Sequence, residues 1–118
     1  MKALLIISHG SRSVQAVEEV VALAQALKSQ SRFDLVGHAF LDVAQPDIPT
    51  ALRSCVQKGA REIVVLPHFL NSGKHVLNDV PDFIARARKD HPEVRFEVLA
   101  AVGLRPHFVD LCLDILRE

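Results

Sequence analysis

Residues 3–11 read ALLIISHGS, five consecutive apolar residues that end at once in a polar turn containing glycine. An uninterrupted apolar run of this length is typical of a strand buried on both faces, as in a parallel sheet. From residue 14 to residue 27 the apolar side chains recur every three or four positions, which predicts a helix whose inner face holds Val14, Val17, Val21, Ala24 and Leu27. The chain therefore begins with a buried strand followed directly by a helix.

The same alternation repeats three more times. Further strands are expected over residues 33–41, 62–66 and 95–102, and further helices over 46–59, 81–91 and 106–116. Strands that alternate with helices favour a parallel sheet with right-handed crossovers and helices on both faces. We therefore predict an α/β three-layer sandwich with a four-stranded parallel sheet in the order 2-1-3-4, and one domain over residues 1–118.

The composition is that of a globular protein. Basic and acidic residues number 14 each, so the formal net charge is zero with the six histidines neutral. A protein that binds nucleic acid through its phosphates normally carries a basic excess, so this class is excluded. No apolar run approaches the roughly 20 residues needed to span a bilayer. The first residues also lack the apolar region of a secretory signal, so we expect a cytoplasmic protein.

The two cysteines, Cys55 and Cys112, stand far apart in segments with a helical pattern. They form no CxxC pair, which argues against a metal or redox motif. We expect two reduced, buried thiols.

Candidate ligands for a metal follow the predicted strands. His9 comes directly after the first strand, Asp42 after the second, and His75 lies in the long segment after the third. Ligands of parallel sheets bind at the carboxyl ends of the strands, where the strand order reverses. In the order 2-1-3-4 this point lies between the first and third strands. Two imidazoles and a carboxylate at this edge predict a site for a borderline divalent metal.

Each candidate also has a purely structural explanation. His9 could cap a helix, His75 could be a solvated loop residue, and Asp42 could be a turn residue. His68, at the end of the third strand, could reach the same cleft or pack beside it. The turn over residues 8–12 has the glycine and following helix of an anion cradle, but no G-x-G-x-x-G or P-loop lysine signature.

Three segments in this order and spacing carry a family resemblance: LLIISHGSR (4–12), AFLDVAQPDIPTAL (39–52) and IVVLPHFLNSGKHVLNDVP (63–81). Together they resemble the small single-domain sirohydrochlorin chelatases of the CbiX type, in the class II chelatase family. The resemblance implies a chelatase-like (flavodoxin-like) fold. It also implies an ATP-independent enzyme that inserts Co²⁺ or Fe²⁺ into a reduced tetrapyrrole in cobalamin or sirohaem biosynthesis. The metal, for which Ni²⁺ is a further candidate, is then a substrate, and no permanent cofactor is expected.

The same resemblance assigns roles to residues. His9 and His75 match the family's metal-handling and proton-accepting histidines, and Asp42 stands where the family usually has glutamate. We expect substrate contacts from Ser11, Arg12, His68, Ser72, Gly73 and Lys74. Two copies are expected to build the cleft as a homodimer, with no nucleic acid or membrane partner. Two other functions stay open: a metal-delivery protein of the same fold, and a flavodoxin-like module for a nucleotide or other small molecule.

Overall fold

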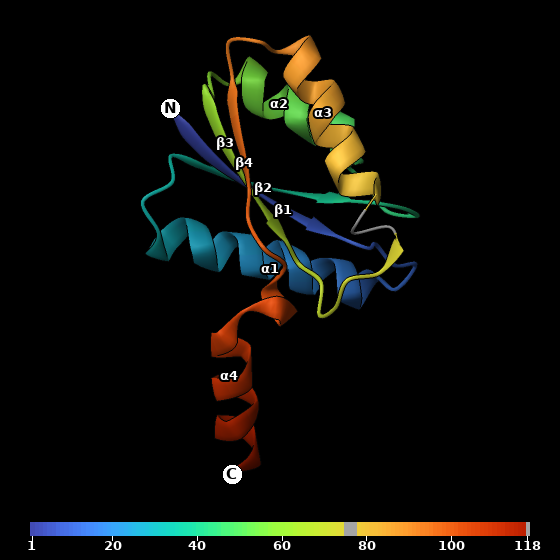
Figure 1. Ribbon diagram of the computed structural model, residues 1–118, viewed down its shortest axis with the longest axis vertical. Helices are drawn as coiled ribbons and strands as arrows, with labels where there is room; N and C mark the ends of the chain where they lie inside the picture. Colours follow the sequence, from blue (N-terminus) through green and yellow to red (C-terminus); the bar gives the residue numbers. More distant parts are fainter. Residues whose placement is uncertain (75–77, 118) are drawn as a thin grey trace.

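The computed structural model of the chain describes residues 1–74 and 78–117 (Figure 1). Four parallel strands form one sheet in the order β2-β1-β3-β4. Their bounds are β1 (Lys2–Ser8), β2 (Leu35–Phe40), β3 (Glu62–Pro67) and β4 (Arg95–Val98). The predicted strand order is confirmed.

The fourth strand is shorter than expected, because β4 ends at Val98 and not at residue 102. The carbonyl of Val65 accepts a hydrogen bond from the Leu99 N–H at 2.9 Å, so the backbone groups of Val65 face β4. Backbone groups two residues further along a strand face the same neighbour. Pro67 therefore also faces β4, and proline has no N–H to donate. The ladder between β3 and β4 ends at this proline.

Helices cover both faces of the sheet, as predicted. The element bounds are α1 (Val14–Gln30), α2 (Ile48–Gln57), α3 (Val80–Asp90), the 3₁₀ turn η2 (Val102–Leu104) and α4 (Pro106–Leu116). Figure 1 shows α1 on one face and α2 with α3 on the other, while α4 points away from the sheet on the α1 side. The three-layer sandwich is thus built by the first three helices. Among the described residues, no helix is both long and apolar enough to cross a membrane.

Polar side chains begin two of these helices. The side chain of Ser13 accepts a hydrogen bond from Ala16 N–H at the start of α1, and Asp47 accepts one from Thr50 N–H at 2.9 Å at the start of α2. Both residues supply an acceptor for backbone donors that have no partner within the helix. Gly59, with φ +105°, directly follows the C-cap of α2, as is common for a glycine that ends a helix.

The core lies on both sides of β1. Residues 3–7 are at most 4% exposed, as expected for a strand covered on both faces. The larger cluster lies under α2 and α3, and a smaller one joins α1 to the sheet through Ile6 and Phe40. On α1 the buried residues are Val20 and Ala24, whereas Val14, expected inside, is 71% exposed. Because residues 20 and 21 are both valine, the helix has two overlapping apolar stripes, one through each of them. The stripe through Val20 faces the sheet, so Val14 lies outside the buried face.

The cysteines differ in burial, and one expectation was wrong. Cys55 is buried in the larger core cluster, but Cys112 on α4 is exposed. The error has a simple cause: α4 has the apolar pattern of a packed helix, yet it has no buried residue.

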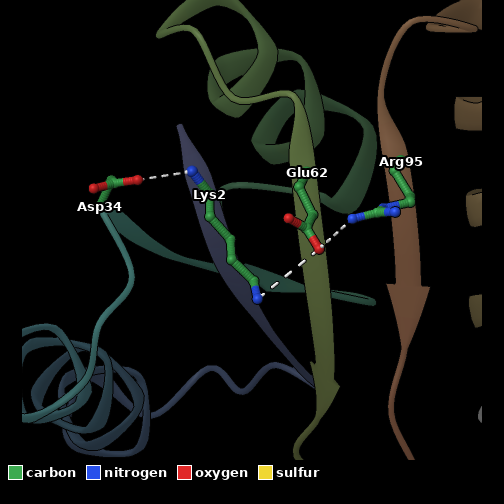
Figure 2. Close-up of polar contacts among 4 residues, drawn as sticks. All are labelled: Lys2, Asp34, Glu62 and Arg95. Carbon is green, nitrogen blue, oxygen red and sulfur yellow. Dashed lines mark hydrogen bonds and ion pairs between the residues drawn. The ribbon is translucent and has the colours of Figure 1, made fainter.

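Charged residues cluster at the amino ends of the strands (Figure 2). The Glu62 carboxylate pairs with Lys2 Nζ at 3.9 Å and with Arg95 Nη2 at 3.2 Å. The backbone N–H of Lys2 also donates to Asp34 at 2.8 Å. Exposed ion pairs contribute little stability, so we expect this group to add little to the free energy of unfolding. The candidate functional residues lie at the opposite edge of the sheet, where the strands end.

At the carboxyl edge, the pairing of β1 with β2 continues past the strands. Leu41 N–H donates to Ser8 O at 2.9 Å, and Asp42 N–H donates to His9 O at 3.0 Å. Gly10 follows with φ +100°. A Cβ at this position would overlap the Asp42 carbonyl oxygen. Only glycine lets the two loops approach this closely.

Replacing Gly10 with alanine should therefore destabilise the protein more than replacing Gly59. Both have positive φ, +100° and +105°, and a side chain in this region costs roughly 1–2 kcal/mol. A Cβ on Gly59 meets nothing within 4 Å, so Gly59→Ala measures the backbone strain alone. Urea unfolding of Gly10→Ala should show a larger loss, because the Asp42 loop must also move. Equal losses in the two variants would contradict the close approach.

Candidate functional site

His9 and Asp42 are brought together at the carboxyl edge of the sheet. The backbone bond between Asp42 N–H and His9 O, 3.0 Å long, fixes the two residues side by side on neighbouring chain segments. Both are exposed. The His9 ring packs edge-on against the Phe69 ring, with centroids 4.5 Å apart and an interplanar angle of 74°. An imidazole held by one neighbour and open to solvent can accept a proton or bind a metal.

A cavity of about 650 Å³ opens beside this pair. Its walls come from the loops after β1 and β2 and from the start of α3, and they consist of His9, Gly10, Leu41, Asp42, Val43, Asp79, Asp82, Phe83 and Arg86. The volume lies within the roughly 300–1,000 Å³ typical of small-molecule sites. The lining combines one imidazole, three carboxylates and one guanidinium with the apolar side chains of Leu41, Val43 and Phe83.

Asp42 is one of the exposed residues that line this cavity. One carboxylate oxygen, Oδ1, accepts a hydrogen bond from Val43 N–H at 2.8 Å. Val43 has φ 54°, a left-handed conformation that is unusual for a β-branched residue. The bond and the turn orient the Asp42 side chain, while its exposure leaves it accessible to a cation.

His68 lies on the other side of His9. Its backbone N–H donates to Ile7 O at 2.7 Å, and its Nδ1 is 2.9 Å from the hydroxyl oxygen of the buried Ser8. His9, His68 and Ser11 all line a second cavity, of about 210 Å³, between the first loop and α1. Burial lowers the pKa of His68. A neutral imidazole is the form that can bind a metal or accept a proton.

The other residues predicted to contact the substrate lie in two separate segments, one before α1 and one after β3. Ser11 Oγ accepts a hydrogen bond from Ser13 N–H at 3.0 Å, so its hydroxyl also shapes the loop before α1. Arg12 is exposed beside it. Ser72, Gly73 and Lys74 are exposed after β3 and line none of the cavities described above. His75, the second predicted metal-handling histidine, lies outside the described residues. Within those residues, no three His, Cys, Asp or Glu side chains cluster closely enough to hold a metal ion.

Sequence reasoning missed the contribution of α3 to the larger cavity. Asp79 directly precedes α3, and Asp82, Phe83 and Arg86 follow on the same helix face. The signal was present in their spacing of three and four residues, which places side chains on one face of a helix. Val80, Ile84 and Ala87 form the buried face of α3, and Asp82 and Arg86 lie outside it and line the cavity.

The free energy of unfolding should fall as the pH is lowered from about 7 to about 5, an interval that includes the ordinary histidine pKa of about 6.5. Burial lowers the pKa values of both His68 and His38 in the folded protein. The unfolded chain therefore binds these protons first, so acidification favours unfolding, and stability rises again with pH. His68→Phe should reduce this loss in urea unfolding, with His38 supplying the remainder. The control is His107→Phe, an exposed residue of α4. An unchanged pH dependence in His68→Phe would refute the effect of burial on His68.

Comparison with known proteins gives a consistent result. The family model for CbiX matches residues 3–118. The chain is 31% identical over 115 residues to the chloroplastic sirohydrochlorin ferrochelatase of Arabidopsis thaliana, a match covering 98% of this chain and 49% of that protein. The chain thus spans about half the length of this curated relative.

Solved structures share the fold. The sirohydrochlorin chelatase SirB of Bacillus subtilis subspecies spizizenii, in complex with cobalt, superposes with a TM-score of 0.87 at 29% identity, over 98% of this chain and 50% of that one. A CbiX protein structure from Marinobacter aquaeolei gives a TM-score of 0.85 at 24% identity, over 100% of this chain and 96% of that one. The second match supports the fold alone. Because the family model covers nearly every residue and the fold agrees, this chain belongs to the CbiX family.

Proposed function

We propose that this chain is a sirohydrochlorin chelatase, which inserts Co²⁺ or Fe²⁺ into a reduced tetrapyrrole without ATP, in cobalamin or sirohaem biosynthesis. The Arabidopsis relative is named for iron and the Bacillus structure holds cobalt, so both metals are candidates, with Ni²⁺ as a third. The metal is a substrate of this reaction, and no permanent cofactor is required.

The observation that carries the proposal is the adjacency of His9 and Asp42 on one wall of the 650 Å³ cavity. Insertion requires two pyrrole N–H protons to leave the macrocycle while the metal sheds water and passes to four nitrogens. An imidazole beside a carboxylate can hold the incoming cation weakly and accept a proton. A closed set of four protein ligands would hold the metal too tightly for transfer.

We assign His9 to metal handling and proton acceptance, together with His75, whose role rests on the sequence resemblance. Asp42 is assigned to the metal. Aspartate is one methylene shorter than the glutamate usual in the family, and the bond from Val43 N–H, at 2.8 Å, fixes the direction of its carboxylate. His68 and Ser11 extend the same rim from the second cavity.

The charges around the larger cavity fit a cation and an acidic macrocycle together. Asp79 and Asp82 add negative charge beside Asp42, which favours a divalent cation. Arg86 on the same wall can bind a carboxylate of the tetrapyrrole by a charge-assisted hydrogen bond. We assign further contacts with the substrate to Arg12 and to residues 72–74.

We further propose that two copies form a homodimer and that the protein acts in the cytoplasm. The dimer is supported by the lengths of the relatives, since this unit fills 49% of the Arabidopsis protein and 50% of the Bacillus chain. The part of each of those proteins outside the match is together about as long as this unit. The cytoplasmic location is supported by the sequence pattern alone.

Metal insertion should be measurable from the absorbance of sirohydrochlorin mixed anaerobically with Co²⁺ or Fe²⁺. Wild type should exceed the protein-free rate, and His9→Ala or His75→Ala should each lower kcat by about 100-fold or more, the usual contribution of a general base. Asp42→Asn should reduce the rate less, because the metal keeps its imidazole contacts. His107→Ala, a change of an exposed histidine on α4, should leave the rate unaltered.

Two results would contradict the assignment of chelatase activity to His9 and His75. A wild-type rate equal to the protein-free control, with metal still bound, would identify a metal-delivery protein. Insertion that survives both histidine substitutions would place the chemistry on other groups.

Substrate binding should depend on Arg86. Arg86→Ala should raise KM by about 10- to 100-fold with little change in kcat, because it removes one charge-assisted hydrogen bond of roughly 1.5–3 kcal/mol. Lys89→Ala serves as the matched control, since Lys89 is an exposed cation in the last turn of the same helix. Equal effects of the two substitutions would mean that Arg86 acts only through the overall charge.

A further inference from the structure

A small cavity between α2 and α3 adjoins the larger cavity beside His9. This interhelical cavity has a volume of about 40 Å³ and lies between two helices on the same face of the sheet (Figure 1). Phe83 and Arg86 of α3 line both cavities. From α2, Arg53 lines the interhelical cavity. The two cavities therefore meet at two shared side chains, and the smaller one extends the larger one toward α2.

The interhelical cavity has the size of a small polar group. A cavity measured in this way needs roughly 10–15 Å³ to hold one water molecule. Its volume of about 40 Å³ therefore admits a group of about three heavy atoms, such as a carboxylate. Pro49 and Leu52 of α2 supply apolar walls, which reduce the access of water to a group bound there.

The two arginines beside this cavity have donors to spare. Both are exposed, and among the described residues neither Arg53 nor Arg86 forms an ion pair. Arg53 Nη2 donates one long hydrogen bond, 3.4 Å, to Thr50 Oγ1. The Asp47 carboxyl pKa is lowered chiefly by hydrogen bonds with Thr50 and less by the charge of Arg53. Because a guanidinium has five N–H donors in a planar fork, most donors of Arg53 stay available to a ligand.

The position of Arg53 directs it toward the carboxyl edge of the sheet. The residue before α2, Asp47, forms a bridge with Phe40 at the end of β2, so α2 begins at this edge. The bond from Arg53 to Thr50 runs toward the same end of the helix. Side chains of a helix also tilt toward its amino end. Arg53 thus approaches the larger cavity from the second turn of α2.

The charge of the lining changes sign between the two cavities. The interhelical cavity has two guanidiniums and one carboxylate, that of Asp90, and is positive with His91 neutral. The larger cavity has three carboxylates and one guanidinium. Along α3 the change occurs between Asp82 and Arg86, four residues or about 6 Å apart on the helix axis. A ligand that carries a cation at one place and carboxylates at another fits this order.

A tetrapyrrole with peripheral carboxylates is such a ligand. Its ring nitrogens receive the metal and therefore belong beside His9 and Asp42, whereas its carboxylates extend outward from the ring. We propose that Arg53 and Arg86 together bind one peripheral carboxylate in the interhelical cavity, and so orient the ring relative to His9. Two guanidinium forks suit a carboxylate, since each can donate two parallel hydrogen bonds. The inference rests on the proposed function for its substrate and adds Arg53 as a specificity residue.

The test measures the binding of a metal-free tetrapyrrole, so that it requires no insertion. Uroporphyrin carries eight peripheral carboxylates, and its fluorescence reports binding to the full chain. Arg53→Ala should raise the Kd about tenfold, because one charge-assisted hydrogen bond is lost. The matched control is Lys58→Ala, which removes an exposed cation at the end of the same helix, outside both cavities. Its Kd should equal that of wild type, and circular dichroism should show that both variants fold.

The double variant Arg53→Ala/Arg86→Ala tests whether the two arginines share one carboxylate. Removing either guanidinium frees a shared carboxylate from the other as well. The combined rise in Kd should therefore be smaller than the product of the two single effects. A rise equal to that product would mean that each arginine binds a carboxylate of its own, and would overturn the shared subsite.

Three further results would overturn the proposal. The first is an unchanged Kd in Arg53→Ala, and the second is an equal effect of Lys58→Ala, which would reduce Arg53 to its overall charge. The third is an affinity for inorganic phosphate, titrated alone, that is lost in Arg53→Ala, because the cavity would then take a free anion.

The proposed reaction is decided by a separate measurement, the rate of metal insertion. A chain that binds uroporphyrin through Arg53 but inserts no metal would retain the subsite and refute the reaction. A chain that inserts metal with the same KM in wild type and Arg53→Ala would retain the reaction and refute the subsite.

Discussion

The backbone pairing of β1 with strands on both sides is the constraint on which the rest of this protein depends. Residues 3–7 of β1 are almost completely buried, so all their backbone groups must be satisfied within the sheet. The pairing does not stop with the strand. On one side it continues to His9 and Asp42, and on the other His68 N–H donates to Ile7 O at 2.7 Å. The most buried segment of the molecule thereby fixes the backbone positions of His9, Asp42 and His68.

This arrangement explains how a small protein can hold exposed side chains in defined positions. His9 is held through its own carbonyl and through the Phe69 ring, 4.5 Å away, so its imidazole can stay exposed and still have a defined position. Gly10 lets the neighbouring loop approach within van der Waals limits that any side chain would violate. A group that binds a metal transiently needs this combination of accessibility and preorganisation.

The fold was largely predictable from the sequence, because strand runs and helical periodicity report local burial. The strand order followed from the alternation of strands and helices and is confirmed. The end of β4 was not predictable from its own residues, because the cause lies in the neighbouring strand. Pro67 of β3 has no N–H to continue the hydrogen bonds between the two strands. The helical pattern of residues 106–116 correctly gave α4 but could not show whether its apolar face meets the same chain. Periodicity identifies a face that prefers burial, and it carries no information on what buries it.

The residues of the candidate site also divide into those that the sequence predicts and those that depend on packing. His9, Asp42 and His68 could be found because each directly follows a strand, and parallel strands bring such positions to one edge. The direction of Asp82 and Arg86 depends on the rotation of α3 about its axis, which is set by the packing of Val80 and Ile84 into the core. Their spacing places them on one helix face, but it does not show that the loops after β1 and β2 complete a cavity beside that face. The buried face of α3 thus determines which charges enter the cavity. Core packing and site electrostatics are therefore not separate properties here, since a change that rotates α3 would move both an aspartate and an arginine away from His9.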